Sequence, residues 1–425
     1  MKTGKCTIAL FAGIFLLMPG CFRAYAQDET GYITVSGIVK DAKNRKKLEY
    51  VNISAIGTHI GTVSNEEGKF TLKISRALHV SEIEFSCIGY FNARVTISGD
   101  QTQERTFLMT PKNIQLNEVE ISGWKDPRDL VQAAIRKVDA NYSLNPNLMT
   151  GFYRETIQKR RKYINLSEAV IHIYKSGYTS PPEHDRVQIL KGRKLISQKA
   201  SDTLGVKLLG GPTMGIYVDI VKNRDVLLEE DMLLHYLYKM GEMTSVNDRL
   251  QYVVHFSPRT VLPYPLYSGT FYIDRETLSF SRAEFSMDMS DKIKVSSIIL
   301  KGKPVGLRFS PEEVTYTVAY KYYNGKTYLN YVRNEIRFKC DWKRRLFATN
   351  YSVIGETVIT DNQEDSVPKI LNRESFSLRQ SLSQEVSAYY DEDFWGAYNI
   401  IEPTESLENA VGRLKKQQKY EDAKQ

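Results

Sequence analysis

The feature that most limits the folds open to this chain is a two-residue alternation of apolar and polar side chains. Side chains of a β-strand point alternately to the two faces of a sheet, so this period predicts strands. The 27 tyrosines and 17 phenylalanines agree with that prediction, because aromatic side chains suit a pleated surface. The fold class is therefore expected to be mainly β. The long alternating runs are residues 152–157, 163–174, 187–196, 250–256, 270–273, 281–287, 314–323, 327–340 and 346–359.

The connections between these runs carry turn signals. Asn324-Gly325 is typical of a two-residue hairpin turn, because both residues tolerate positive φ angles. Residues 245–248 (SVND) predict a second turn, and residues 208–212 (LLGGP) mark a loop. Residues 229–240 fit a helix or a strand equally well. A large antiparallel β-meander is expected from these signals.

A single helix is expected to precede the meander. Asp126 can cap its first turn, Pro127 suits the first helical position, and Asp129 is favoured at the positive end of the helix dipole. The helix should end near Asn141, before Pro146. Its apolar face would be formed by Leu130, Val131, Ala134, Ile135 and Val138, which recur at intervals of three and four.

The N-terminal part of the chain contains shorter runs with turn signals between them. A spacing of about ten residues is typical of an antiparallel sandwich of roughly seven strands. Residues 64–68 (SNEEG) and Gly89 provide the turn chemistry, since glycine permits backbone conformations that a side chain hinders. The runs are residues 33–39, 50–56, 69–74, 83–86, 93–97 and 105–109.

The same residues resemble a known family. The strings SGIVKDAKNRKKLEYVNISAIGTHIGTVSNEEGKFTLKI (36–74) and IEFSCIGYFNARVTI (83–97) are similar to the carboxypeptidase-regulatory-like domain, a transthyretin-like sandwich of Gram-negative envelope proteins. Residues 47–49 (KLE) depart from the family, which usually has a glycine there, so one turn is in doubt. The resemblance implies a non-catalytic module. His79-Val80-Ser81-Glu82 has the spacing of a zinc peptidase motif but lies within this sandwich, so we interpret His79 and Glu82 as exposed polar residues.

The later part of the chain resembles the open half-barrel of periplasmic lipoprotein carriers. The similarity rests on the helix-then-strand at 126–157 and on the hairpin SGTFYIDRETLSFSRAEFSMD (268–288). It implies a strongly curved sheet whose concave apolar face is partly covered by the helix and suits a lipid tail or an apolar segment of a partner. A filled core without a cavity is the alternative.

The N-terminus predicts export. Lys2 and Lys5, an apolar run at 8–18 and Ala24-Tyr25-Ala26 form the pattern of a secretory signal, with cleavage expected after Ala26. Lipidation of Cys21 is the alternative. Export places the mature protein in the periplasm or on the periplasmic face of the outer membrane. It is expected to be soluble or peripheral, because no stretch is long and apolar enough to span a membrane.

The charge of the chain does not favour nucleic acid as a partner. The formal net charge is +8, and removal of residues 1–26 takes away three basic residues, leaving 8 − 3 = +5. Basic clusters occur at residues 43–47, 158–162 and 343–345. We interpret these clusters as solvated turns and strand ends, with an anionic lipid or glycan surface as the alternative.

Residues 114–123 (IQLNEVEISG) resemble the segment that couples an outer-membrane transporter to its energising partner. A transporter barrel of about 22 strands would need several hundred residues, and 425 − 123 = 302 follow the segment. We therefore expect residues 112–125 to be a linker.

In the tail, residues 371–425, a short helix is expected. Asp391, Glu392 and Asp393 are read as an acidic turn with aromatic anchors rather than a calcium site, and residues 361–365 (DNQED) as a hairpin loop.

The sequence predicts no catalytic, cofactor-binding or metal-binding residue. Cys87 and Cys340 lie in alternating strands and are expected to be separate buried thiols. The six histidines are scattered, and His172 and His255 are expected to be structural.

The domains expected are a signal peptide (1–26), the sandwich (31–111), the linker (112–125), the helix with its meander (126–370) and the tail (371–425). The favoured function is a non-enzymatic envelope protein whose adaptor sandwich and β domain bind an outer-membrane protein, a lipid or a glycan. The alternatives are a periplasmic hydrolase with dispersed active-site residues and an accessory component of an outer-membrane transport system.

Overall fold

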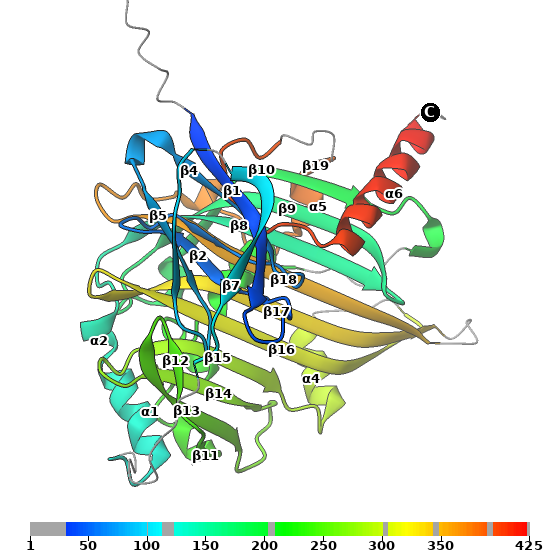
Figure 1. Ribbon diagram of the computed structural model, residues 1–425. Coiled ribbons are helices and arrows are strands. Elements are labelled where there is room, and N and C mark those ends of the chain that lie inside the picture. The colour runs from blue at the N-terminus through cyan, green and yellow to red at the C-terminus, as the bar shows by residue number, and fades with distance from the viewer. Residues whose placement is uncertain are drawn as a thin grey trace, which may run out of the picture.

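The computed structural model describes residues 31–99, 101–112, 123–202, 209–300, 305–342, 348–388 and 394–422 (Figure 1). The predicted signal with Cys21 and Ala26, most of the segment 114–123, the basic residues 343–345 and the acidic residues 391–393 lie outside the described residues. None of the described helices is long and apolar enough to cross a membrane.

The N-terminal unit is a seven-strand sandwich, as expected. It consists of a three-stranded sheet in the order β4-β1-β7 and a four-stranded sheet in the order β3-β2-β5-β6. The rings of Phe70, Phe85 and Phe107 pack between the two sheets, with centroids 4.8–5.4 Å apart. The strands are β1 (Tyr32–Asp41), β2 (Asn52–Ala55), β3 (Gly61–Val63), β4 (Lys69–Ser75), β5 (Glu82–Ser86), β6 (Ala93–Thr96) and β7 (Gln101–Met109).

One pairing in the sandwich differs from the antiparallel arrangement expected. Strand β7 runs parallel to β1, with a register shift between Val35 and Gly37. Gly37 allows this close approach, because a Cβ atom at that position would lie 2.4 Å from the carbonyl oxygen of Arg105. Strand alternation shows which face a residue occupies but not which neighbour its strand pairs with.

The second unit is one twelve-stranded sheet in the order β11-β13-β14-β15-β16-β17-β18-β8-β9-β10-β19, with β12 paired to β13. Its pairings are antiparallel except that of β10 with β19. All nine predicted strands are confirmed: β8 (Asn147–Lys159), β9 (Lys162–Lys175), β10 (Arg186–Ile196), β13 (Arg249–Pro258), β14 (Tyr267–Asp274), β15 (Phe280–Met287), β16 (Leu307–Tyr323), β17 (Lys326–Trp342) and β18 (Thr349–Gln363). The remaining strands are β11 (Tyr236–Met240), β12 (Thr244–Val246) and β19 (Ser387–Ala388).

Both predicted turns of this sheet are confirmed. Asn324 and Gly325 have φ angles of 46° and 81°, and Asn247 and Asp248 have φ angles of 51° and 57°. The ambiguous stretch 229–240 is a 3-10 helix, η5 (Met232–His235), followed directly by β11.

The predicted helix begins as expected and is interrupted before its predicted end. Asp126 accepts a hydrogen bond from the backbone N–H of Arg128, and α1 spans Pro127–Arg136. A break at Lys137 separates it from α2 (Val138–Asn141). The other helices are α3 (Gly211–Tyr217), α4 (Lys292–Ile299), α5 (Leu382–Glu385) and the 18-residue α6 (Glu405–Asp422), which is longer than the short helix expected.

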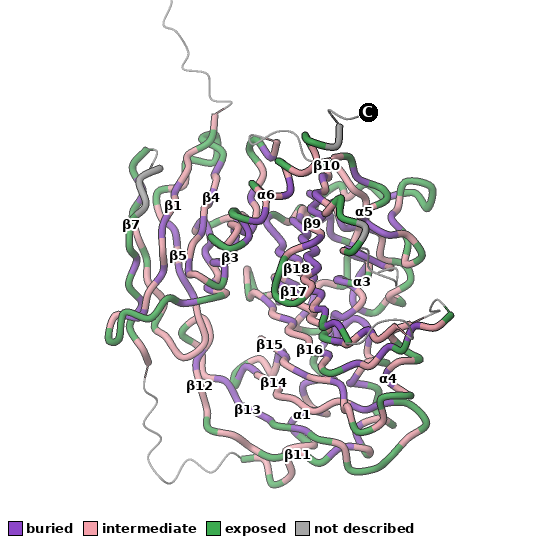
Figure 2. The backbone as a smooth tube through the Cα atoms, turned by 90° about the vertical axis from the view of Figure 1, so that its right-hand side faces the viewer, coloured by how far each residue is buried: buried purple, intermediate pink, exposed green. Residues whose placement is uncertain are grey.

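The large sheet is strongly curved around its helices. One contiguous apolar cluster, the main cluster, draws residues from ten strands of the sheet and from helices that include α1 and α3. Strands lie about 4.8 Å apart, so a flat sheet would separate its outer members too far for such contact. Figure 2 shows the buried stretches running through β9, β17 and β18 at the centre of the molecule. We call the face that carries the main cluster the inner face.

The sandwich packs on the opposite, outer face of this sheet. The rings of Tyr50 and Tyr331 stack with centroids 5.4 Å apart, and Arg333 forms an ion pair of 3.2 Å with Glu66. The tail lies between the two units, where Thr62 donates a hydrogen bond to the carbonyl oxygen of Ile400. Figure 2 shows the sandwich alongside the large sheet.

Candidate functional site

A row of three polar side chains and one glycine crosses the inner face of the large sheet. The register places Asn334, Gly355, Glu155 and Ser167 side by side on β17, β18, β8 and β9. We call these four residues the polar row. A Cβ atom on Gly355 would lie 2.6 Å from the amide oxygen of Asn334 and 3.1 Å from the hydroxyl of Tyr153, so glycine leaves room for both side chains.

Glu155 is a buried acid in this row. Its side chain is 6% exposed, and its carboxylate accepts a hydrogen bond of 3.3 Å from the hydroxyl of Tyr153. Burial raises the pKa of Glu155 to about 7, and the hydrogen bond from Tyr153 lowers it only in part. The carboxyl group is therefore partly protonated near neutral pH.

Beyond the polar row lies a second apolar region of the inner face, which we call the end cluster. Half-buried side chains of α4 and β17, among them Ile299 and Trp342, pack against it. Helix α4 covers part of this region through Ile299, and its Val295 is fully buried in a neighbouring cluster with Met287 and Val314. The buried members of the end cluster are Ile157, Ile164, Leu307, Phe309, Phe338, Cys340, Tyr351 and Val353.

The two apolar regions have different covers. The main cluster is filled by α1, α3 and the chain from Ile216 to Leu233, so the filled core considered as an alternative describes this part of the inner face. The end cluster is covered by α4, an eight-residue helix whose Ile293 and Ile298 face solvent. The end cluster is thus the part of the inner face that a single short helix protects, whereas several segments fill the main cluster.

A group of charged residues is buried within the main cluster. Lys175 forms ion pairs of 2.8 Å with Asp185 and 2.9 Å with Asp219, and the hydroxyls of Tyr178 and Tyr320 donate hydrogen bonds of 3.0 and 2.8 Å to Asp219. The side chains of Lys175 and Asp219 are 0% exposed. Burial acts to lower the pKa of Lys175, but the two carboxylates outweigh it and raise that pKa.

The same group contains a second lysine. Lys222 donates a hydrogen bond of 2.9 Å to the hydroxyl of Ser176, and burial lowers its pKa to about 8, an effect that Asp185 opposes. A substrate cannot reach the ion pair of Lys175 and Asp219 without opening the core. We therefore interpret this charged group as structural, because its buried charges are satisfied by one another and by neighbouring hydroxyl groups.

The residues that the sequence singled out are not brought together. His79 is exposed at the end of a 3-10 helix and Glu82 begins β5, and among the described residues no group of three His, Cys, Asp or Glu side chains could hold a metal ion. Cys87 is half-buried and Cys340 buried, both as free thiols, and burial raises the pKa of each to about 11.

Two of the histidines have local structural partners. The ring nitrogen of His255 lies 2.9 Å from the hydroxyl of Thr270. Burial lowers the pKa of His172. His59 lies 3.1 Å from Glu364 and packs against Tyr323 with ring centroids 4.2 Å apart, so it joins the sandwich to the large sheet.

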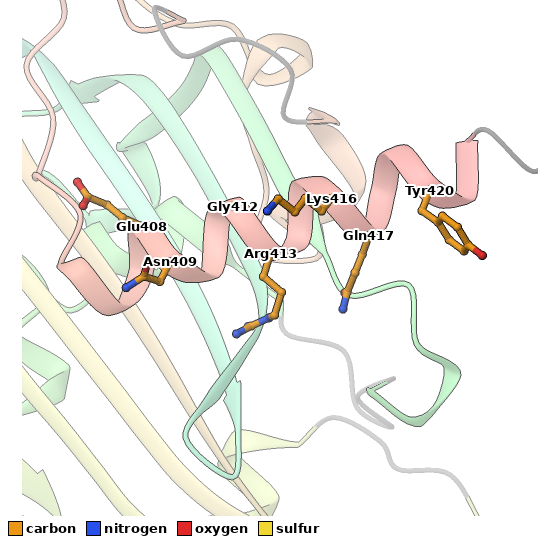
Figure 3. A pocket seen from close by; sticks show the side chains of 7 residues that line it. All are labelled: Glu408, Asn409, Gly412, Arg413, Lys416, Gln417 and Tyr420. Atoms are coloured by element: carbon orange, nitrogen blue, oxygen red, sulfur yellow. The ribbon is translucent and has the colours of Figure 1, made fainter.

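A surface hollow of about 690 Å³ lies along α6 (Figure 3). Asn409, Arg413 and Gln417 point to the same side of the helix, and Arg413 donates a hydrogen bond of 2.9 Å to the carbonyl oxygen of Tyr163. The described residues that line the hollow all belong to this one helix. It is an open surface depression along one helix and does not enclose a ligand as a binding pocket does.

The polar row, α4 and Trp342 were not singled out by the sequence. The strand alternation did carry part of the signal, because Tyr153, Glu155 and Ile157 share one face of β8. An acid between two large apolar neighbours on one face of a strand indicates a buried carboxyl group, since such a position is rarely charged without a partner.

Comparison with known proteins agrees with the N-terminal resemblance. Residues 35–121 match the family model of the CarboxypepD_reg-like domain, the family that the sequence resembles there. No curated protein matches the sequence.

Three solved structures are similar to parts of this chain. A putative outer membrane lipoprotein-sorting protein domain from Vibrio parahaemolyticus has 10% identity and a TM-score of 0.25, covering 58% of this chain and 94% of that one. A LolA superfamily protein from Nitrosomonas europaea has 10% identity and a TM-score of 0.21, covering 56% and 94%. A DUF1329 family protein from Desulfovibrio piger has 12% identity and a TM-score of 0.24, covering 57% and 95%. At these TM-scores the likeness carries no argument about the fold or the function of this chain.

Proposed function

We propose that this chain is a non-catalytic protein of the cell envelope that binds an acyl chain, or a similar apolar group, at the end cluster. Its sandwich acts as an adaptor on the outer face of the sheet. The protein is exported and works in the periplasm or on the periplasmic face of the outer membrane. The signal-like N-terminus and the carboxypeptidase-regulatory-like domain support this location.

The observation that carries the proposal is the end cluster under α4. A binding site for an apolar group needs an apolar lining, a boundary that limits how far the group enters, and a cover that can move. Phe309, Phe338 and Val353 supply the lining. The polar row supplies the boundary, because an acyl chain that covered the carboxyl group would remove it from other polar groups and could not form a hydrogen bond with it. Helix α4 supplies the cover, as a helix this short is marginally stable by itself.

The lining also contains no group suited to chemistry. Its described members are aliphatic or aromatic apart from the thiol of Cys340, whose pKa of about 11 keeps it protonated at neutral pH. Glu155, the acid nearest in register, has a buried carboxyl group held by Tyr153. These features favour binding over catalysis.

The test is to purify the protein from envelopes without detergent and to examine it by native mass spectrometry followed by lipid extraction. We expect a bound lipid in the wild type and its loss in Ile299→Lys, which places a charge on the half-buried side of α4. Ser297→Lys adds the same charge on the exposed side and should retain the lipid. Lipid-free wild type, or equal retention by the two variants, contradicts the proposal.

A further inference from the structure

Several connections of the large sheet emerge at one end, where α4 lies. The register of the antiparallel pairs places there the β8–β9 turn, the chain after β10, the β13–β14 connection and the β15–β16 connection. We call the described residues of these connections, together with Arg308 at the start of β16, the rim. Figure 1 shows this end on the right, with α4 and the free ends of β16 and β17, and Figure 2 turns it toward the viewer.

The rim is rich in exposed basic side chains. Within the described part of the chain, none of seven such residues forms an ion pair. The acids of the rim are engaged locally, since Asp202 pairs with Lys159, Asp288 accepts from Ser290, and Asp291 caps α4. The basic residues are Arg160, Arg161, Lys162, Lys199, Arg259, Lys292 and Arg308.

Other charged groups border the rim. Helix α6 adds Arg413, Lys416 and Lys419 next to the start of β9, where Arg413 is bonded to Tyr163. Asp341 lies opposite Arg308 on β17. The acidic residues 229–231 precede the edge strand β11, which starts at the same end of the sheet beside Arg259 but at the other edge of the sheet from β10. The positive charge is therefore densest around the β8–β9 turn.

The β8–β9 turn keeps two arginines in a backbone conformation that disfavours them. Arg160 and Arg161 form a two-residue hairpin turn with φ angles of 50° and 64°. Two-residue hairpin turns of this kind prefer Asn-Gly, because the left-handed region is unfavourable for larger side chains. The comparable turn at the opposite end of the sheet does contain Asn324-Gly325. A strained turn that retains two cations suggests a role for the cations themselves.

Apolar side chains project from the same rim. Val261 on the β13–β14 connection is 85% exposed, Ile293 on α4 is 83% exposed, and Val305 after α4 is fully exposed. Lys294 of α4 donates a hydrogen bond to the carbonyl oxygen of Leu262, which holds the two connections together. Grouped exposed aliphatic side chains mark a contact surface, because it is energetically favourable to bury their apolar surface away from water.

We propose that the rim is a docking surface for a bilayer of anionic phospholipid. Basic side chains are attracted to the negative surface, and exposed aliphatic side chains on neighbouring loops enter the boundary between headgroups and acyl chains. An acidic protein partner would match the cations but would leave Val261 and Ile293 in water. This inference goes beyond the proposed function, because a protein can bind such a surface whether or not its end cluster holds an acyl chain.

The test is sedimentation of the purified protein with vesicles of phosphatidylglycerol and phosphatidylcholine. We expect binding to the anionic vesicles that weakens as salt rises, and little binding to pure phosphatidylcholine. The variant R160N/R161G should bind roughly 25-fold less tightly, since each cation near such a surface contributes about fivefold. Its thermal stability should be unchanged or higher, because Asn-Gly suits the turn. Val261→Ser with Ile293→Ser should bind more weakly at every salt concentration.

The matched control is R45G/K46N in the sandwich. It also removes two exposed positive charges, and Arg45 also has a positive φ angle, of 63°. We expect this control to bind vesicles as the wild type does. Equal binding to neutral and anionic vesicles overturns the proposal, as does an equal loss in the control and in R160N/R161G. Binding to a soluble polyanion such as heparin without binding to vesicles overturns it as well.

Discussion

Replacement of Glu155 by glutamine should stabilise the protein at alkaline pH and have little effect at acidic pH. The folded protein holds the proton of Glu155 with a pKa of about 7, whereas the ordinary value is 4.5. The raised pKa contributes to the free energy of unfolding because the folded protein binds this proton more tightly than the unfolded chain does. This contribution is fully present below pH 4.5 and is lost as the pH rises through about 7. Glutamine has nearly the same shape and cannot ionise, so it avoids this loss.

The magnitude follows from the two pKa values. Each tenfold change in proton affinity corresponds to about 1.4 kcal/mol, so a rise from 4.5 to about 7 corresponds to about 3 kcal/mol at most. We expect the difference in free energy of unfolding between Glu155→Gln and the wild type to increase by about 2–3 kcal/mol from pH 4.5 to pH 8. The buried side chain is only 6% exposed, so solvent screening removes little of this effect.

The assay is urea unfolding followed by tryptophan fluorescence at pH 4.5, 6 and 8. Glu385→Gln makes the same chemical change at an exposed position and should show no such dependence on pH. The reasoning fails if the effect of Glu155→Gln is the same at all three pH values, or if the variant is relatively less stable at pH 8 than at pH 4.5.

Two further substitutions test the packing of the inner face. Asp219→Ala leaves Lys175 buried with one fewer carboxylate and should lower the free energy of unfolding by about 3–5 kcal/mol in urea, and a loss below about 1 kcal/mol would show that the ion pair is open to water. Gly355→Ala should lower it by about 1–3 kcal/mol because the new methyl group meets the amide of Asn334, and most of this loss should disappear in the double variant with Asn334→Ala. An undiminished loss in that double variant would mean that the backbone of Gly355, and not the contact with Asn334, sets the cost.

The strands of both units could be predicted because their signal is local. Each long run of alternation between Phe152 and Ile359 became a strand, and Asn324-Gly325 became the expected turn. The cap at Asp126 likewise depends only on the residues that follow it. The sandwich could also be recognised by its spaced motifs, which agree with the family match over residues 35–121.

Helix α4 could not be predicted from its own residues. Its sequence, KIKVSSII, alternates at the start and is rich in β-branched side chains, so it is typical of a strand. It is helical because Asp291 accepts hydrogen bonds from the N–H groups of Ile293 and Lys294, and because Val295 is buried against Met287 and Val314. Tertiary contacts thus override the local preference.

The groups that meet on the inner face were also hidden in the sequence. Lys175 and Asp219 are 44 positions apart, and Asn334 reaches Glu155 only through the register of three neighbouring strands. Alternation places each residue on a face but gives neither strand order nor register. The parallel pairing of β1 with β7 was missed for the same reason.

The most direct test of acyl binding uses Trp342, which packs against the end cluster. Fatty acids brominated along the chain quench a tryptophan only on close contact, so titration of the lipid-free protein reports occupancy of this region. The account predicts saturable quenching in the wild type that is largely lost in Trp342→Phe. The variant Trp395→Phe changes a tryptophan on the outer face and should retain the quenching. Quenching that persists in Trp342→Phe, or none in the wild type, would contradict acyl binding at the end cluster.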